Sequence, residues 1–177
     1  EAISITSEDP VSVYVMNRKD QSCDGYLALP VDSWGDEYIH VSYHDHSFRG
    51  RKGGFIVIAS EDNTECNIFL KGKGSSNLRT AGGRHLGSSF KIKMDKGDVY
   101  MVSGAGTSDE FDLSGSHISS DKPVGLISYH ERAVIPDGVR GGNDHLSEML
   151  LPVSKWGMNY STVEFLRKGS GDFFRLI

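Results

Sequence analysis

The chain has 177 residues, of which 37% are hydrophobic and 24% charged, a composition typical of a globular protein and not of a disordered one. A net charge of −5 without any basic run argues against nucleic-acid binding. The longest apolar run, Phe55–Ala59, is too short to cross a membrane, so no membrane insertion is expected.

Short strands are predicted along most of the chain, because β-branched and aromatic residues alternate with polar ones. In chain order these strands cover Val11–Val15, Phe55–Ala59, Cys66–Leu70, Phe90–Met94, Val99–Val102, Ser116–Ser119, Val124–Tyr129 and Ser161–Leu166, with a partial strand over Asp172–Ile177. The polar turn Glu61–Thr64 predicts a hairpin between the second and third strands, and Asp95–Asp98 predicts another between the next two. Ser120–Pro123 is predicted as a further turn, and His145–Leu150 as one helical turn at most.

Strand spacing sets the expected fold class. Short strands at roughly ten-residue intervals, joined by Gly- and Ser-rich connections, are typical of all-β sandwiches. We therefore expect an all-β fold of antiparallel β-sandwich-like modules, and a propeller or a barrel remains the alternative.

The chain also contains an internal repeat of about 113 to 122 residues. Ile5–Val11 returns as Ile118–Val124, and Leu29–Gly35 returns as Leu151–Gly157. The repeat predicts that residues 1–50 form the C-terminal part of one module, that 53–167 form a nearly complete second module, and that 168–177 begin a further one. We expect the chain to be part of a longer protein. The recurring Trp34 and Trp156 are expected to be structural.

Five short motifs occur in one order along almost the whole chain. They are Leu27–Val31, Ser60–Thr64, Ile118–Val124, the Asp-His-Leu-x-Glu segment of residues 144–148, and Leu151–Gly157. In this order they resemble the N-terminal domain family of the IgGFc-binding protein, found in secreted mucus, adhesive and matrix proteins. The resemblance implies an extracellular, non-catalytic domain. Members often carry a cysteine just before the Asp-His-Leu segment, and this chain has Asn143 there.

Two cysteines, Cys23 and Cys66, leave two alternatives open. Either both are unpaired thiols, or they form one disulfide, as an extracellular compartment would allow. Asn159 begins an Asn-Tyr-Ser glycosylation sequon, which a secreted protein could use.

Candidate metal sites come from histidines and from acidic loops. His40, His44 and His46 would share one face of a strand and could hold zinc or copper, whereas a solvated, histidine-rich strand end is the alternative. The acidic loops Ser60–Glu65 and Ser108–Asp112 could supply oxygen ligands to calcium. Turn chemistry, in which the side chains bond their own backbone, explains these loops equally well.

The loop between the repeated motifs of the second copy is the expected partner-specific surface. Its candidate binding residues are His130, Glu131, Arg140, Asn143, Asp144 and His145. Motifs for nucleophilic or phosphate chemistry are absent from the sequence. We therefore predict a non-catalytic, secreted adhesion or matrix module with no required cofactor. It would contact extracellular proteins or glycans, self-association included. The alternatives are a calcium-assisted carbohydrate-binding module and a hydrolase on a β-sandwich, which would need two carboxylates in one cleft.

Overall fold

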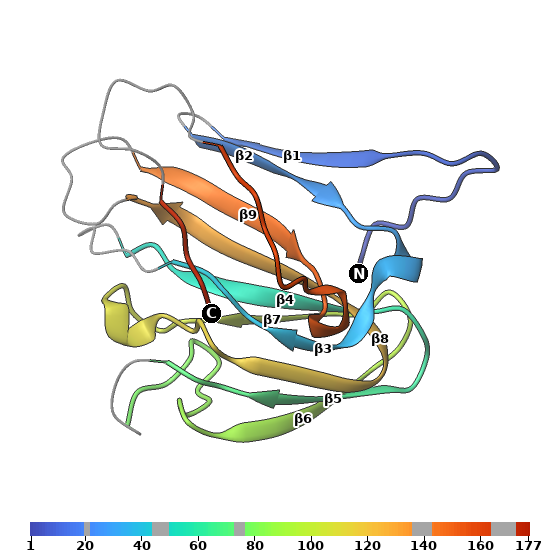
Figure 1. Ribbon diagram of the computed structural model, residues 1–177. Helices are drawn as coiled ribbons and strands as arrows, with labels where there is room; N and C mark the ends of the chain where they lie inside the picture. Colours follow the sequence, from blue (N-terminus) through green and yellow to red (C-terminus); the bar gives the residue numbers. More distant parts are fainter. Residues whose placement is uncertain (20–21, 44–49, 73–76, 136–142, 164–172) are drawn as a thin grey trace.

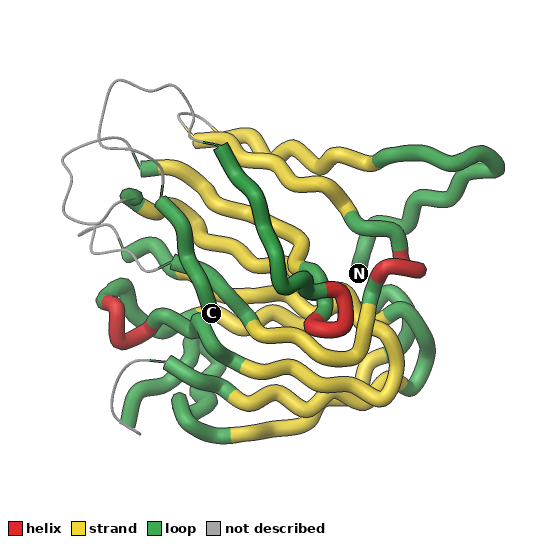
Figure 2. The backbone as a smooth tube through the Cα atoms, viewed as in Figure 1, coloured by secondary structure: helices red, strands yellow, loops and turns green. Residues whose placement is uncertain are grey.

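The computed structural model describes residues 1–19, 22–43, 50–72, 77–135, 143–163 and 173–177 (Figure 1). Within them the strands are β1 (Val13–Lys19), β2 (Ser22–Ala28), β3 (Gly35–Ile39), β4 (Gly53–Ala59), β5 (Thr64–Phe69), β6 (Ser89–Met94), β7 (Val99–Ser103), β8 (His117–Ala133) and β9 (Asp144–Leu150). The helical segments described are three 3₁₀ turns: η1 (Val31–Ser33), η2 (Asp109–Phe111) and η3 (Val153–Lys155), as Figure 2 shows. The predicted all-β, antiparallel class is confirmed. In the part of the chain described, no helix is long and apolar enough to span a membrane.

The 17-residue strand β8 organises the larger, seven-stranded sheet, which is strongly curled (Figure 1). Its first part, from His117 to Ser120, pairs with β5 and β3. Its second part, from Val124 onward, pairs with β4 and β9. Strand β6 extends the sheet beyond β5, and β7 extends it beyond β4. One strand therefore runs through two groups of strands that curl over a common core.

The two predicted hairpins are wrong. Strands β4 and β5 follow one another in sequence, yet they do not pair with each other, and each pairs with a different part of β8. Likewise β6 pairs with β5, and β7 pairs with β4. Alternation indicates which face a side chain occupies, but it does not identify the partner strand. The turn predicted at Ser120–Pro123 lies inside β8, where the ladder passes from β5 to β4. Pro123, which has no N–H to donate, sits at this passage. His145–Leu150 belongs to strand β9 and not to a helical turn.

The core lies inside the curled sheet and follows the period of the strands. Phe55 and Val57 of β4 face inward beside Cys66 and Ile68 of β5, and all four are fully buried. Leu126 of the second part of β8 joins the same cluster. Each such aliphatic or aromatic side chain contributes about 1.5–3 kcal/mol on burial. The predicted apolar runs thus supply the core even though their pairing differs from the prediction.

The hairpin β1–β2 forms a separate two-stranded sheet that lies beside β9 (Figure 1). Carboxylates make the attachment. The Asp24 carboxylate accepts a hydrogen bond from the Ser147 backbone N–H at 2.6 Å. Asp144 Oδ1 accepts hydrogen bonds from the Ser22 hydroxyl at 2.7 Å and from the Cys23 backbone N–H at 2.9 Å. The Ser22 hydrogen bond is the main reason that the pKa of Asp144 lies below its usual value.

Candidate functional site

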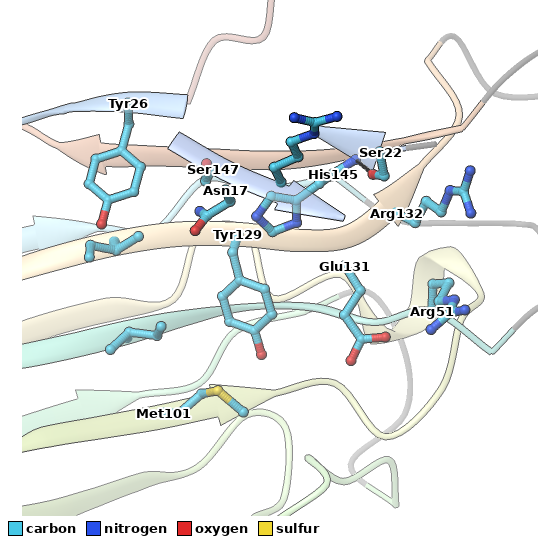
Figure 3. A pocket seen from close by; sticks show the side chains of 13 residues that line it. Asn17, Ser22, Tyr26, Arg51, Met101, Tyr129, Glu131, Arg132, His145 and Ser147 are labelled. Carbon is cyan, nitrogen blue, oxygen red and sulfur yellow. Dashed lines mark hydrogen bonds between the residues drawn. The ribbon is translucent and has the colours of Figure 1, made fainter. Parts of the chain in front are cut away.

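A groove of about 740 Å³ opens where the attached hairpin meets the curled sheet. Its lining comes from β1, β2, β4, β7, β8 and β9, and Figure 3 shows the side chains from close by. The carboxylate attachment of β2 to β9 holds one wall of the groove, because Ser22 and Ser147 take part in the attachment and also line the groove. The groove is therefore built by the packing of two sheets.

Strand β8 supplies alternate residues to the groove and to the core. Tyr129 and Glu131 line the groove, while Ser128 and His130 between them face the interior at 5% and 1% exposure. This alternation follows from the two-residue period of a strand. A strand buried on one face thus presents a polar row, Tyr129 and Glu131, on the other.

The floor of the groove is apolar and crosses three strands. Ile127 of β8 pairs with Ile56 of β4, which in turn pairs with Met101 of β7, and all three residues line the groove. Two tyrosines, Tyr26 and Tyr129, stand in the same groove (Figure 3). Burial raises the pKa of both phenols, so both carry neutral hydroxyl groups at physiological pH.

The charge of the groove is opposite to that of the whole chain. Arg18, Arg51 and Arg132 line it together with one carboxylate, Glu131. The chain as a whole carries a net charge of −5. Like charges gathered in a concave surface attract ligands of the opposite sign. The groove is therefore suited to acidic groups.

Ser147 lines this groove and carries a buried hydroxyl. The residue is 8% exposed, and its hydroxyl has no hydrogen-bond partner among the described residues. Its backbone N–H is already bonded to Asp24, so the strand position is fixed. A buried polar group without a partner costs about 1–3 kcal/mol. A polar ligand group that reaches Ser147 would remove this cost.

The predicted loop residues are only partly brought together. Glu131 and His145 line the groove, whereas His130 is buried and its Nδ1 accepts the Arg132 backbone N–H at 3.0 Å. Arg132 Nε donates a hydrogen bond to the Asn143 carbonyl oxygen at 3.1 Å. Asp144 is held in the attachment of β2 to β9, and Arg140 lies outside the described residues. Ligand binding by these residues stays a prediction.

The predicted histidine trio does not appear as a site in the described residues. His40 follows the end of β3 and is fully buried, with its ring 4.9 Å from that of Phe55. Neither ring nitrogen has a hydrogen-bond partner among the described residues, and burial lowers the pKa of His40 to about 3, so the ring is neutral. His44 and His46 lie outside the described residues. Among the residues that are described, no three His, Cys, Asp or Glu side chains gather as metal ligands.

Carboxylates of the two acidic loops take part in turn hydrogen bonds. Asp62 Oδ1 accepts the Lys96 backbone N–H at 2.9 Å. Asp112 accepts hydrogen bonds from the Ser114 hydroxyl and N–H and from Arg175. Burial acts to raise the pKa of Asp112, but these hydrogen bonds outweigh it and the pKa is lowered. The Ser114 contacts are local, as in the turn alternative, whereas the contacts with Lys96 and Arg175 join distant segments of the chain. Calcium binding stays a prediction.

Both cysteines are free thiols in the structure, which agrees with the unpaired alternative and not with the disulfide. Cys66 faces the core and is fully buried, and burial raises the pKa of its thiol to about 11. Cys23 lies on the exposed hairpin strand β2. The two side chains therefore belong to different sheets. Asn159 is exposed, and its glycosylation stays a prediction.

Sequence reasoning did not identify the arginines of the groove, nor Tyr26 and Ser147. Arg51 and Arg132 are far apart in the sequence and come together through the pairing of β4 with β8, and Arg18 joins them when the hairpin docks on the sheet. One signal was available: Tyr129 and Glu131 alternate with the apolar run of β8 and hence share a face. That signal identifies one wall of the groove but not the opposite one.

The sequence is similar to known proteins of one family. A family model described as IgGFc binding protein matches residues 24–177. A human protein, IgGFc-binding protein, is 28% identical over 159 residues, which cover 90% of this chain and 3% of the human protein. The chain thus spans only a small part of that relative, and no solved structure matches it. The match over most of its length shows that the chain belongs to the IgGFc-binding protein family.

Proposed function

We propose that this chain is a non-catalytic, extracellular binding module of the adhesion or mucus type, and that its groove binds an acidic segment of a protein partner. The family is one of binding proteins, and a relative is named for binding the Fc part of IgG. Membership supports binding as the activity, while the groove supports the chemistry of the ligand.

The observation that carries this proposal is the basic groove on an acidic chain. Three arginines line the groove together with its apolar floor and with Ser147, whose buried hydroxyl has no partner among the described residues. Arginine presents a planar set of donors that matches carboxylates in a bidentate manner. Apolar side chains of a bound peptide would cover Ile127 and Met101, and its carboxylates would meet the arginines. A strand-like acidic segment satisfies both parts of the groove.

Titration calorimetry with a short peptide of alternating glutamate and leucine tests the proposal. We expect binding that weakens with added salt and is absent for the same peptide with lysine in place of glutamate. Arg51→Ala should weaken binding about tenfold, as loss of one charge-assisted contact of about 1.5 kcal/mol predicts. Arg79→Ala is the matched control, because Arg79 is exposed and lies away from the groove.

The outcome that contradicts the proposal is equally clear. If Arg51→Ala and Arg79→Ala change affinity by the same factor, the groove is not the binding site. Ser147→Ala offers an independent check, since it removes an unpaired hydroxyl. It should leave stability unchanged or raise it, and it should weaken binding.

A calcium-assisted carbohydrate module is a second candidate, favoured by the two tyrosines of the groove. Sugar rings stack on aromatic side chains, and Tyr26 and Tyr129 both line the groove (Figure 3). Glycan arrays with and without a chelator separate the candidates, because a signal lost on chelation supports this one and no signal in either condition removes it. The hydrolase alternative needs two carboxylates in one cleft, and the described lining of this groove holds only Glu131.

A further inference from the structure

The repeated motif folds the same way at both of its occurrences. In η1 the Trp34 backbone N–H donates to Val31 at 3.0 Å, and the indole Nε1 donates to the Leu29 carbonyl at 2.9 Å. In η3 the Trp156 N–H donates to the Val153 carbonyl at 3.1 Å, and its indole donates to Leu151 at 3.2 Å.

The likeness continues past each tryptophan. The Gly35 N–H donates to the Tyr38 hydroxyl at 3.0 Å, and the Gly157 N–H donates to the Tyr160 hydroxyl at 2.8 Å. The hairpins that precede the two motifs also share a register. Val13 pairs with Ala28 in the first, and Leu126 pairs with Leu150 at the corresponding positions of the second.

The first copy of the motif leads into β3, which we call the donor strand because it pairs with β8. Gly35 pairs with Val124, Tyr38 with Ile118 and Ile39 with His117. The Tyr38 hydroxyl donates to the Val124 carbonyl oxygen at 2.7 Å, and Tyr38 is 1% exposed. A side chain on Gly125 would collide with the Trp34 ring at 2.9 Å, so the ring lies directly on β8.

The second copy of the donor strand, residues 157–163, has no such partner in the described structure. Tyr160 is 79% exposed where its counterpart Tyr38 is buried, and Met158 is 98% exposed. Trp156 is 43% exposed, so its ring is not buried as a structural tryptophan would be. An apolar segment of this kind normally marks an interaction site.

The part of β8 that accepts the donor strand also has a second copy in the sequence, and that copy is exposed as well. Residues 5–11 repeat the sequence of Ile118–Val124, which accepts the donor strand. Ile5 is 61% exposed and Val11 is 64% exposed. The acceptor segment carries Glu8 and Asp9, whereas residues 157–163 carry no charged side chain, so no like charges would oppose each other between the two segments.

We propose that residues 157–163 of one chain pair with residues 4–11 of a second copy of this chain, head to tail, in the register of β3 on β8. Tyr160 then lies opposite Ile5, Ser161 opposite Ser4, and the Tyr160 hydroxyl donates to the Val11 carbonyl. Ser12 stands at the position of Gly125, so the Trp156 ring must lie farther from the acceptor segment than the Trp34 ring lies from β8. Because the two surfaces differ, the contact is heterologous. It leaves an unpaired acceptor segment on one chain and an unpaired donor segment on the other, to which further copies can add.

Engineered cysteines test this register. Residues directly opposite in an antiparallel ladder have Cα atoms about 4.5–5.5 Å apart, within the range that a disulfide bridges. Chains carrying Ser4→Cys are mixed with differently tagged chains carrying Ser161→Cys, both with Cys23→Ser to remove the exposed native thiol. Under a glutathione redox buffer we expect a covalent heterodimer that contains both tags.

The matched control replaces Ser4→Cys by Ser12→Cys, a serine that is also exposed and lies eight positions along the acceptor segment. It should give at least tenfold less heterodimer, because Ser12 is far from Ser161 in the proposed register. Tyr160→Phe in the Ser161→Cys chain should lower the yield about fivefold, the effect of a hydrogen bond worth about 1 kcal/mol. All changed residues are exposed, so the fold is preserved.

Two results would overturn the proposal. One is equal heterodimer from the Ser4→Cys and Ser12→Cys chains, which would mean unspecific collision. The other is no heterodimer from either pair while the unmodified chain sediments as a monomer at every concentration. Neither result bears on the groove, whose peptide titration is read separately.

Discussion

Tyr38→Phe should destabilise the fold far more than the same change at Tyr160. The Tyr38 hydroxyl donates to the Val124 carbonyl at 2.7 Å and accepts the Gly35 N–H at 3.0 Å, and Tyr38 is 1% exposed. Burial raises the pKa of this phenol, so the hydroxyl remains a donor at physiological pH. The substitution removes one oxygen and leaves both backbone groups without that partner.

The expected loss is about 1–3 kcal/mol, the cost of leaving buried polar groups unsatisfied. For a chain of this size the melting temperature should fall by roughly 2–12 °C, since each kcal/mol shifts it by about 2–4 °C. Tyr160→Phe removes the same hydrogen bond to Gly157, but Tyr160 is 79% exposed and water replaces its hydroxyl. Its effect should stay below about 0.5 kcal/mol.

Urea unfolding of both variants, followed by circular dichroism, measures the difference. The slope of free energy against urea should be unchanged, because neither variant alters the surface exposed on unfolding. Equal destabilisation by the two variants would refute the role assigned to the Tyr38 hydroxyl. So would a stable Tyr38→Phe protein with an unchanged midpoint.

Three further predictions concern buried and bridging groups. The pKa of His40 is about 3 in the folded chain against 6.5 for the free side chain. As pH drops below 6.5, the unfolded chain takes up a proton that the folded chain does not. The free energy of unfolding should therefore fall by about 1.4 kcal/mol per pH unit. His40→Phe should flatten this slope in urea unfolding at pH 7 and 5, and an unchanged slope would contradict it. An alkylating reagent should label Cys23 alone in the native protein and also Cys66 after unfolding, as mass spectrometry would show, whereas native labelling of Cys66 would contradict its burial. Asp24→Ala should loosen the hairpin without unfolding the larger sheet, so hydrogen exchange should rise in β1 and β2 and at the Ser147 amide. Unchanged exchange there would refute the role of the bond to Ser147.

Several strands could be predicted from local patterns, while their pairing could not. The runs around Phe55, Cys66 and Phe90 are strands close to the expected places, because alternation and β-branching act over a few residues. Their partners are fixed by β8, which is distant in the sequence. Pro123 suggested a turn since proline often ends strands, yet here it lies where one strand changes partners.

The candidate site was predictable only in part for the same reason. Glu131 and His145 were chosen from the loop between the repeated motifs, and both line the groove. Arg18 and Arg51 had no local signal, because their proximity depends on the docking of β1–β2 through Asp24 and Asp144. The division into modules 1–50, 53–167 and 168–177 stays a prediction.

The shared strand β8 has a mechanical consequence. Because β3 pairs with Val124 as well as with His117–Ser119, the two groups of strands cannot hinge apart between the β5 and β4 ladders without breaking the β3 ladder on β8. Tension along the chain would therefore load both groups through one strand, and neither could yield alone. We expect the larger sheet to give way in a single rupture event under force.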